Sequence, residues 1–305
     1  MMMPNFLIIG ATKAGTTSLY NYLKQHPQIY MSPVKEPRFF AFEGENTPHF
    51  LGYDGKQQRW TVITEIEDYQ ALFRGVSDEI AIGEASTLYL YSPKAPERIR
   101  YHIPDVKVIA ILRDPVERAY SHFLHFVRSS HEPFSDFLQA FQDEENRIQK
   151  NLGMLWHYKN MGFYSVQISR YFKVFDRANI KVYLYEDWNN DPLRFLEEIF
   201  SFLGVDSTFV PDMSLRSNPS VIPKNPALQK FLLYPNFLRS FLKFFLPKKL
   251  RQGISLTLYK ENIKNGFKPP LLSDNVREEL IEVYRDDIWK LQDLINRDLS
   301  MWLKT

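Results

Sequence analysis

The stretch "FLIIGATKAGTTSLYNYL", residues 6–23, is the most informative part of the sequence for the fold. It opens with an apolar run that ends at Gly10, continues through a short loop that holds Lys13 and Gly15, and reads as a helix from Thr16. A strand, a glycine-containing turn and a helix N-terminus form an anion site, because free backbone N–H groups point outward and the helix dipole favours negative charge. The stretch therefore predicts an α/β fold with an anion bound at the end of its first strand.

The loop departs from the ATP-binding phosphate loop at one position. Gly10 and Gly15 have the spacing of G-x-x-x-x-G-K-[ST], but Thr16 stands where that pattern needs a lysine. Lys13 lies inside the loop instead, so we expect an anion smaller than a triphosphate and no metal ion. The alternative interpretation is a structural loop with an incidental lysine. The residues expected to bind the anion are Lys13, Ala14, Gly15, Thr16, Thr17 and Ser18.

The composition is that of an ordinary globular protein. The chain has 305 residues, enough for one sizeable α/β domain with additions or for two small domains. A net charge of +2 does not require a nucleic-acid partner, and the lack of cysteine excludes disulfides and thiolate metal sites. Neither a signal peptide nor an apolar run long enough to span a membrane is visible, so we expect a cytoplasmic protein.

Apolar runs alternate with amphipathic stretches along the chain, which is typical of a parallel sheet with helices on its faces. The predicted strands cover residues 6–10, 81–84, 106–112 and 180–185. The predicted helices cover residues 16–26, 93–102, 115–127, 163–175, 192–203 and 275–295. Ser273 or Asp274 is expected to cap the last of these helices.

Three segments fit this alternation less well. Residues 43–56 read as a surface loop, and residues 214–225 read as an irregular segment that is expected to cover a binding site. Residues 227–246 are very apolar and precede a proline and two lysines. One interpretation is a helical pair packed on the sheet domain. The other is an interfacial segment, extended to residues 227–249, that contacts a membrane or a lipid-like acceptor.

A second informative stretch is "VKVIAILRDPVERAYSHF", residues 106–123. A buried strand brings Arg113 to its carboxyl end, where the ligands of open α/β sheets bind, and Ser121 follows in the next helix. Arg113 can bind a second phosphate group bidentately while Ser121 adds a hydroxyl group. Alternatively, Arg113 and Asp114 form a structural pair that closes the strand end.

Both stretches resemble motifs of one enzyme family. "GATKAGTTSL" resembles the 5′-phosphosulfate loop of sulfotransferases that use 3′-phosphoadenylyl sulfate (PAPS), and "ILRDPVERAYSHF" resembles their 3′-phosphate signature. The likeness continues through "KEPRFF", "YSPKAPERI", "YEDWNNDPLRFLEEIFSFLG" and "RDLSMWL", and it is nearest to the bacterial and heparan-sulfate-like branch. It implies an α/β, P-loop-like three-layer fold with a central parallel sheet and helices on both faces. One domain would span residues 1–305, with residues 214–272 covering the donor or acceptor.

The resemblance also implies the chemistry. PAPS would be the donor, adenosine 3′,5′-bisphosphate (PAP) the product, and no metal would be needed. In-line transfer requires stabilisation of the charge on the leaving phosphate, which we expect from Lys13. A base for the acceptor is expected from Glu36, which precedes two phenylalanines as the family's glutamate does. Glu36 could instead be an exposed loop carboxylate paired with Lys35 or Arg38.

Two positions depart from the family pattern. Arg38 stands where many relatives have histidine, and Ala85 stands where heparan-sulfate enzymes often have a catalytic lysine. Lys13 therefore acts without a partner lysine, or else Lys35 or Lys94 takes the place of the lysine that is missing at position 85.

The remaining site predictions are less specific. We expect His122 to face away from a nucleotide bound at Ser121, since neighbouring helix residues point in different directions. His49, His125 and His131 show no catalytic or metal-binding pattern. Tyr164 is either an adenine-stacking ring or a core residue. Expected acceptor contacts are Lys35, Arg38, Glu84, Ser86 and Tyr89, although Glu84 could simply cap a turn. Further donor contacts are expected from Arg216, Asn218 and Lys224.

Three function classes compete. The first is sulfuryl transfer to a hydroxyl or amine of a carbohydrate or lipid-like acceptor. The second is a small-molecule kinase, which Thr16 disfavours. The third is a non-catalytic module that binds a nucleotide or tethers to a membrane, which the presence of both Lys13 and Glu36 disfavours. The sequence does not determine the oligomeric state.

Overall fold

The computed structural model describes most of the chain. The described residues are 2–45, 50–51, 57–58, 62–129, 131–214, 224–225, 228, 232, 257–258, 261–262, 264, 266–267 and 269–305. Residues 50–51 and 57–58 form the short antiparallel pair β3 (Phe50–Leu51) and β4 (Gln57–Gln58). The predicted site residues Arg216 and Asn218 lie outside the described residues, as does nearly all of the apolar segment 227–246.

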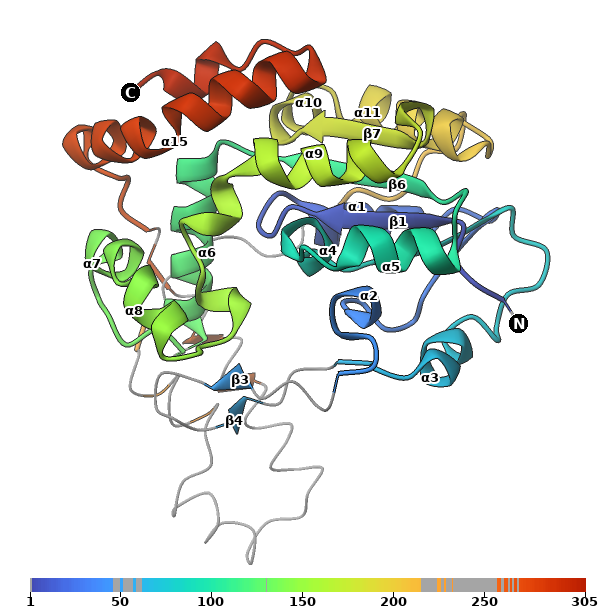
Figure 1. Cartoon of the computed structure of the whole chain (residues 1–305), viewed down its shortest axis with the longest axis horizontal. Coiled ribbons are helices and arrows are strands. Elements are labelled where there is room, and N and C mark those ends of the chain that lie inside the picture. The colour runs from blue at the N-terminus through green and yellow to red at the C-terminus, as the bar shows by residue number, and fades with distance from the viewer. Residues whose placement is uncertain are drawn as a thin grey trace, which may run out of the picture.

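A five-stranded parallel sheet forms the centre of the molecule (Figure 1). Its order is β2-β5-β1-β6-β7. The bounds are β1 (Phe6–Gly10), β2 (Ile29–Met31), β5 (Ala81–Ala85), β6 (Lys107–Leu112) and β7 (Ile180–Leu184). The central strand β1 is buried along its whole length, because helices cover both faces of the sheet. All five strands run in the same direction, so their carboxyl ends lie at one edge.

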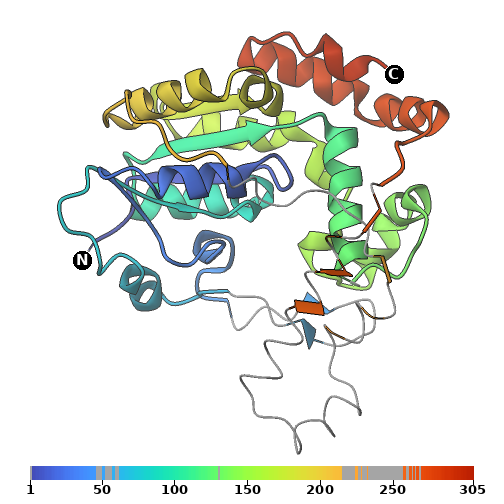
Figure 2. The same ribbon diagram turned by 180° about the vertical axis from the view of Figure 1, so that it is seen from behind.

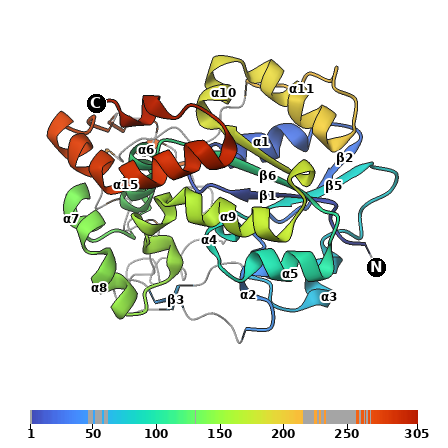
Figure 3. The same cartoon turned by 45° about the horizontal axis from the view of Figure 1, so that its top comes forward.

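Helices cover both faces of the sheet. Figures 1 and 3 show α5 (Ala95–His102) and α9 (Tyr164–Val174) on one face. Figure 2, from behind, shows α1 (Thr16–Leu23) and α11 (Pro192–Leu203) on the other face. The predicted layered α/β fold with helices on both faces is therefore confirmed. Further helices are α2 (Phe39–Phe42), α3 (Ile66–Ala71), α4 (Leu88–Tyr91), α6 (Pro115–Arg128), α7 (Phe137–Gln142), α8 (Glu144–Gln149), α10 (Tyr185–Asn190) and α15 (Asp274–Ile295).

The predicted elements are found within two residues of their expected bounds at most ends. Strand β1 and helix α11 have the predicted bounds, whereas α1 ends at Leu23, three residues before the predicted end. Strand β2 was not predicted, because three residues give too short a pattern. The two-residue strand β3 lies within residues 43–56, the segment predicted to be a surface loop. Ser273 occupies the N-cap position of α15, but its side chain makes no capping hydrogen bond.

Across the helices that the structure describes, none combines the length and the apolar character needed to cross a lipid bilayer.

The contact between β1 and β5 leaves no room for a side chain at Gly83. A Cβ atom at this position would lie 2.1 Å from Cζ of Phe6, whose ring is fully buried. We therefore expect Gly83→Ala to lower the free energy of unfolding by about 2–3 kcal/mol through overpacking. Chemical denaturation of both proteins measures this loss.

A second substitution tests the cause of that loss. Phe6→Leu shortens the obstructing side chain, so the double variant should be less destabilised than the sum of the two single variants. Additive losses would show that Gly83 acts through something other than the Phe6 ring.

Candidate active site

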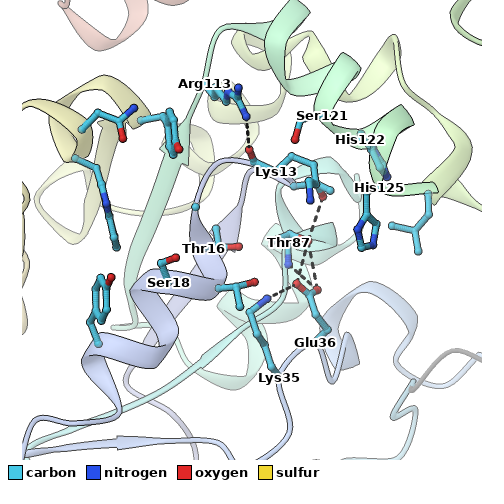
Figure 4. Close-up of a pocket in the computed structure, with 18 of the residues that line it drawn as sticks. Lys13, Thr16, Ser18, Lys35, Glu36, Thr87, Arg113, Ser121, His122 and His125 are labelled. Atoms are coloured by element: carbon cyan, nitrogen blue, oxygen red, sulfur yellow. Dashed lines mark hydrogen bonds and ion pairs between the residues drawn. The ribbon is translucent and has the colours of Figure 1, made fainter. Parts of the chain in front are cut away.

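A cavity of about 660 Å³ lies at the carboxyl edge of the sheet (Figure 4). Residues that follow β1, β5 and β6 line it, and this volume is typical of small-molecule sites. Strand β1 leads to Lys13, β5 to Thr87 and β6 to Arg113. The lining residues are Thr12, Lys13, Gly15, Thr16, Thr17, Ser18, Tyr22, Lys35, Glu36, Arg38, Thr87, Arg113, Ser121, His122, His125, Phe126, Leu155, Tyr185, Trp188, Asn189 and Pro192.

The loop between β1 and α1 presents free backbone donors to this cavity. Lys13 and Gly15 both have left-handed backbone conformations, with φ of 70° and 87°. A side chain at Gly15 would also come within 3.3 Å of the Tyr185 ring. Among the described residues, no acceptor bonds the backbone N–H groups of Gly15, Thr16 and Thr17. These three donors stand at a helix N-terminus, so the loop has the properties of an anion site.

The Lys13 side chain lines the cavity without a partner among the described residues. Its ammonium group forms no hydrogen bond or ion pair with them. Burial, together with the smaller effects of the nearby charges of Arg128, Arg113 and Lys35, lowers the pKa of Lys13 to about 8. The group is still mostly charged at neutral pH, and a buried cation without a counter-ion favours an anionic ligand.

Arg113 follows β6 and lies beside the phosphate-loop backbone. Its Nη1 donates to the Lys13 carbonyl oxygen at 3.3 Å, and Nη2 lies 3.3 Å from Oε2 of Glu117. Its guanidinium group stacks 5.0 Å from the centre of the Tyr185 ring. The hydroxyl of the buried Tyr164 donates to the Arg113 carbonyl oxygen at 3.0 Å, so Tyr164 is a core residue that holds the arginine's backbone.

The alternative pairing of Arg113 with Asp114 is wrong. The Asp114 carboxylate caps α6, where it accepts hydrogen bonds from the backbone of Val116 and Glu117. Its other oxygen lies 2.6 Å from Nη2 of Arg277. Asp114 therefore ties α15 to α6 and leaves the Arg113 guanidinium group at the cavity.

One face of α6 supplies three polar residues to the cavity. Ser121 lines it, and so do His122 and His125, so the expectation that His122 faces away from this site was wrong. The reason is that Ser121 and His122 both neighbour His125 on the helix surface, at spacings of four and three residues. Burial, more than the nearby cations, lowers the pKa of His122 well below its ordinary value and that of His125 to about 3. Both rings are therefore neutral at physiological pH.

Glu36 lies across the cavity from Arg113 in Figure 4, held by a set of short contacts. Oε2 accepts from the Thr87 backbone at 2.9 Å, and Oε1 accepts from the Thr87 hydroxyl at 3.1 Å. Lys35 Nζ lies 2.9 Å from Oε1, and Arg38 Nε lies 3.8 Å from Oε2. Burial would raise the pKa of Glu36, but the charges of Lys35 and Arg38 and these hydrogen bonds outweigh it and lower the pKa. The carboxylate is therefore ionised and fixed, not an exposed loop residue.

Several predicted site residues do not line the cavity. Glu84, Ser86 and Tyr89 are fully buried beneath it, because β5 ends there and the chain turns into α4, so the prediction that they contact the acceptor was wrong. Ala14 is buried, and its N–H donates to the Ala11 carbonyl oxygen.

Two predicted lysines lie elsewhere. Lys94 pairs with Glu45 at 2.9 Å and does not line the cavity, so of the two lysines considered as substitutes at the site, only Lys35 lies there. Lys224 is exposed, and its backbone N–H donates to the Asn262 carbonyl oxygen.

Sequence reasoning missed the aromatic wall of the cavity. Tyr22 of α1 and Trp188 of α10 stack with ring centres 5.4 Å apart, and Tyr185 lies beneath Arg113. A signal for Tyr185 was present, because it directly follows a strand, as Arg113 does. Thr87 lies two residues after the end of β5, so the same rule about strand ends could have identified it. Nothing in the sequence distinguished Tyr22 or Trp188 from the many core aromatics.

Comparison with known proteins agrees with this geometry. A sequence profile described as "Sulfotransferase family" matches residues 4–209. The crystal structure of a sulfotransferase from Alicyclobacillus acidocaldarius is 33% identical in sequence, has a TM-score of 0.74, and is matched over 99% of both chains.

Two human proteins are similar in sequence to this chain. The bifunctional heparan sulfate N-deacetylase/N-sulfotransferase 3 is 30% identical over 99% of this chain, which corresponds to 31% of the human protein. Carbohydrate sulfotransferase 15 is 27% identical over 67% of this chain and 44% of its own length. The chain thus spans less than half the length of these curated relatives. Because the family profile covers more than half of the chain and a solved sulfotransferase matches its whole length, the protein belongs to the sulfotransferase family.

Proposed function

We propose that the protein transfers a sulfuryl group from PAPS to a hydroxyl or amine of a carbohydrate or lipid-like acceptor and releases PAP. The observation that supports this most is the buried Lys13 cation, which has no partner among the described residues and adjoins three free backbone donors. A kinase is not favoured, because Thr16 stands where an ATP-binding loop has its lysine. The expected independence from metal ions stays a prediction.

The cavity has groups suited to each part of the donor. The free N–H groups of residues 15–17 and the Lys13 ammonium group would receive the 5′-phosphosulfate. Arg113 and Ser121 would receive the 3′-phosphate. The rings of Tyr22 and Trp188 offer flat apolar surface for the adenine.

The reaction needs one proton acceptor and one stabilised leaving group. The acceptor oxygen or nitrogen forms a bond to sulfur while the bond from sulfur to the phosphate oxygen breaks. Glu36 takes the proton of the acceptor, since it is ionised and is fixed by Thr87. Lys13 stabilises the negative charge that develops on the leaving phosphate.

The class of acceptor is supported by relatives whose names refer to carbohydrate and heparan sulfate. Lys35 and Arg38 line the same part of the cavity, and both lie close to Glu36. The remaining parts of the proposal are a single domain over residues 1–305, a covering role for residues 214–272, and membrane contact through residues 227–249.

Calorimetric titration with PAP tests the donor site. Arg113→Ala should weaken PAP binding about 10–100-fold, because hydrogen bonds to a charged group contribute about 1.5–3 kcal/mol. Arg194→Ala is the matched control, since Arg194 is an exposed arginine that pairs with a glutamate four residues away, as Arg113 does. The control should bind PAP like the wild type.

Titration with ATP and Mg²⁺ separates the two enzyme classes. The wild type should bind ATP much more weakly than PAP, because ATP has no 3′-phosphate for Arg113. ATP binding that equals PAP binding and is unaffected by Arg113→Ala would reject the sulfotransferase proposal and favour the kinase.

A further inference from the structure

The segment that carries Glu36 has an unusual backbone. Residues 36–40, here called the base loop, include two non-glycine residues with left-handed conformations, Glu36 at φ 61° and Arg38 at φ 60°. Such conformations persist only where the surroundings hold them. Three backbone N–H groups of the base loop bond to residues 85–89, which comprise the last residue of β5 and the four residues after it. The end of β5 therefore determines where the Glu36 carboxylate stands.

Two of those three anchors are hydroxyl groups. Ser86 Oγ accepts from the Arg38 backbone at 3.0 Å, and Tyr89 Oη accepts from the Phe40 backbone at 3.4 Å. A hydroxyl that accepts from the backbone must direct its own proton elsewhere, and its rotation is fixed only if an acceptor takes that proton. The third anchor is the Ala85 carbonyl oxygen, which accepts from Glu36 at 2.9 Å and needs no such support.

Glu84 is the acidic group beneath both hydroxyls. It is fully buried, and its Oε1 accepts from the Tyr69 hydroxyl at 3.2 Å. Its Oε2 has no hydrogen-bond partner among the described residues. The side chains of Ser86 and Tyr89 nevertheless interact with this carboxyl group, and both favour its ionised form. The second oxygen is thus a buried acceptor without a donor, and the carboxyl group that carries it interacts with the same two hydroxyls that accept from the base loop.

We infer that Glu84 is a positioning residue, which orients the Ser86 and Tyr89 hydroxyls and through them holds the base loop. The inference rests on the proposed role of Glu36 as the base. Glu84 does not line the cavity, so it acts on the reaction only through the base loop. A buried carboxyl group at a strand end is otherwise costly, because nothing in the described chain pairs it with a cation.

The charge of Glu84 is compatible with this role in both protonation states. The pKa of Glu84 is raised to about 7, because burial and, less strongly, the nearby Glu36 carboxylate outweigh the hydroxyls of Tyr89, Ser86 and Tyr69, which lower it. Tyr171 of α9 also faces this charge. Either protonation state keeps an oxygen that accepts hydrogen bonds. Glu84→Gln keeps one such oxygen, and Glu84→Leu keeps none.

The experiment compares five variants by NMR and by steady-state kinetics. The pKa of Glu36 is followed by titration of protein labelled with ¹³C at glutamate carboxyl groups, with the signal assigned by its loss in Glu36→Gln. Glu84→Leu, Ser86→Ala and Tyr89→Phe should raise the pKa of Glu36 towards its ordinary value, because the base loop no longer keeps it beside Lys35, Arg38 and Thr87. Glu84→Gln should show a smaller rise in the pKa of Glu36.

The kcat of Glu84→Leu, Ser86→Ala and Tyr89→Phe should fall about 10–100-fold, since a small displacement of a catalytic group has effects of that size.

Tyr69→Phe is the matched control. It removes a hydroxyl that bonds Glu84, but this hydroxyl bonds no backbone group of the base loop among the described residues. Its Glu36 pKa and kcat should match the wild type. The KM for PAPS and the affinity for PAP should be unchanged in all five variants, since the phosphate loop is untouched.

Three results would overturn the inference. The first is a Glu36 pKa and a kcat that stay at wild-type values in Glu84→Leu, Ser86→Ala and Tyr89→Phe. The second is a kcat of Tyr69→Phe that falls as much as theirs, and the third is a loss of PAP affinity that equals the loss of kcat. A wild type that transfers no sulfuryl group would count against the proposed function alone, because the NMR titration measures the position of Glu36 without turnover.

Discussion

Lys13→Met is expected to lower kcat about 10²–10³-fold, the usual effect of removing a group that stabilises charge developing in a transition state. Methionine keeps much of the length and packing of lysine but has no charge. The Lys13 ammonium group has no partner among the described residues, so its loss leaves no buried counter-ion behind in the free protein. The measurement is sulfuryl transfer at saturating PAPS and acceptor. Lys94→Met is the control, because Lys94 is an exposed lysine paired with Glu45 outside the cavity.

The same lysine determines the alkaline limit of activity. Lysine is charged below its pKa, and the pKa of Lys13 in the free protein is about 8. The kcat/KM for PAPS should therefore decline as the pH rises through about 8, and Lys13→Arg should move this decline to higher pH, because arginine stays charged. A decline at the same pH in Lys13→Arg would assign it to another group and contradict the role of Lys13.

The sheet and the two phosphate-facing segments could be predicted from the sequence, for a definite physical reason. Parallel strands buried on both faces read as short apolar runs, and their carboxyl ends must lie at one edge. Arg113 directly follows such a run and Lys13 comes three residues after another, so they were expected to meet, and they lie at one cavity in the structure. Both predictions depended on chain order and strand direction, not on side-chain packing.

The direction of individual side chains could not be predicted in the same way. Glu84 and Thr87 are three residues apart at the same strand end, yet Glu84 is enclosed and Thr87 binds Glu36. The sequence suggested Glu84 as an acceptor contact because a charged residue ending an apolar strand is unusual. One of its oxygens accepts a hydrogen bond from Tyr69 of α3, which lies 15 residues earlier and which no local pattern connects to it.

The base loop shows a second limit of prediction from the sequence. Glu36 and Arg38 adopt left-handed conformations, which non-glycine residues rarely do, so local preferences argue against the geometry that brings Glu36 to the cavity. Contacts with residues 85–89, about 50 positions later in the chain, hold that geometry. The resemblance to a family motif identified Glu36, whereas physical reasoning about residues 33–40 alone also allows an exposed carboxylate paired with Lys35 or Arg38. The structure contains that pairing and the cavity-facing position together.

Glu36→Gln is expected to lower kcat about 10²–10⁴-fold while PAP binds as in the wild type, because a general base acts on the acceptor and not on the donor. Glutamine fits the same space and keeps one oxygen for Thr87, so the cavity should keep its shape. The wild-type rate should hold as the pH falls to near 4.5 and decline below it, since the base must be ionised and Lys35, Arg38 and Thr87 lower the pKa of Glu36 from 4.5. Glu45→Gln, at a carboxylate that pairs with Lys94 and does not line the cavity, is the control.

A histidine is the competing base, and the same measurement distinguishes the two. His125 lines the cavity, and burial lowers its pKa to about 3, so the ring is neutral and has a free pair of electrons at physiological pH. However, its Nδ1 already accepts from Nη2 of Arg128 at 3.1 Å, and an imidazole of such low pKa is a weak proton acceptor. If Glu36→Gln keeps most of the wild-type kcat and His125→Gln loses it, then the base is the histidine. The contacts of Thr87 and Lys35 with Glu36 would then have only a structural role.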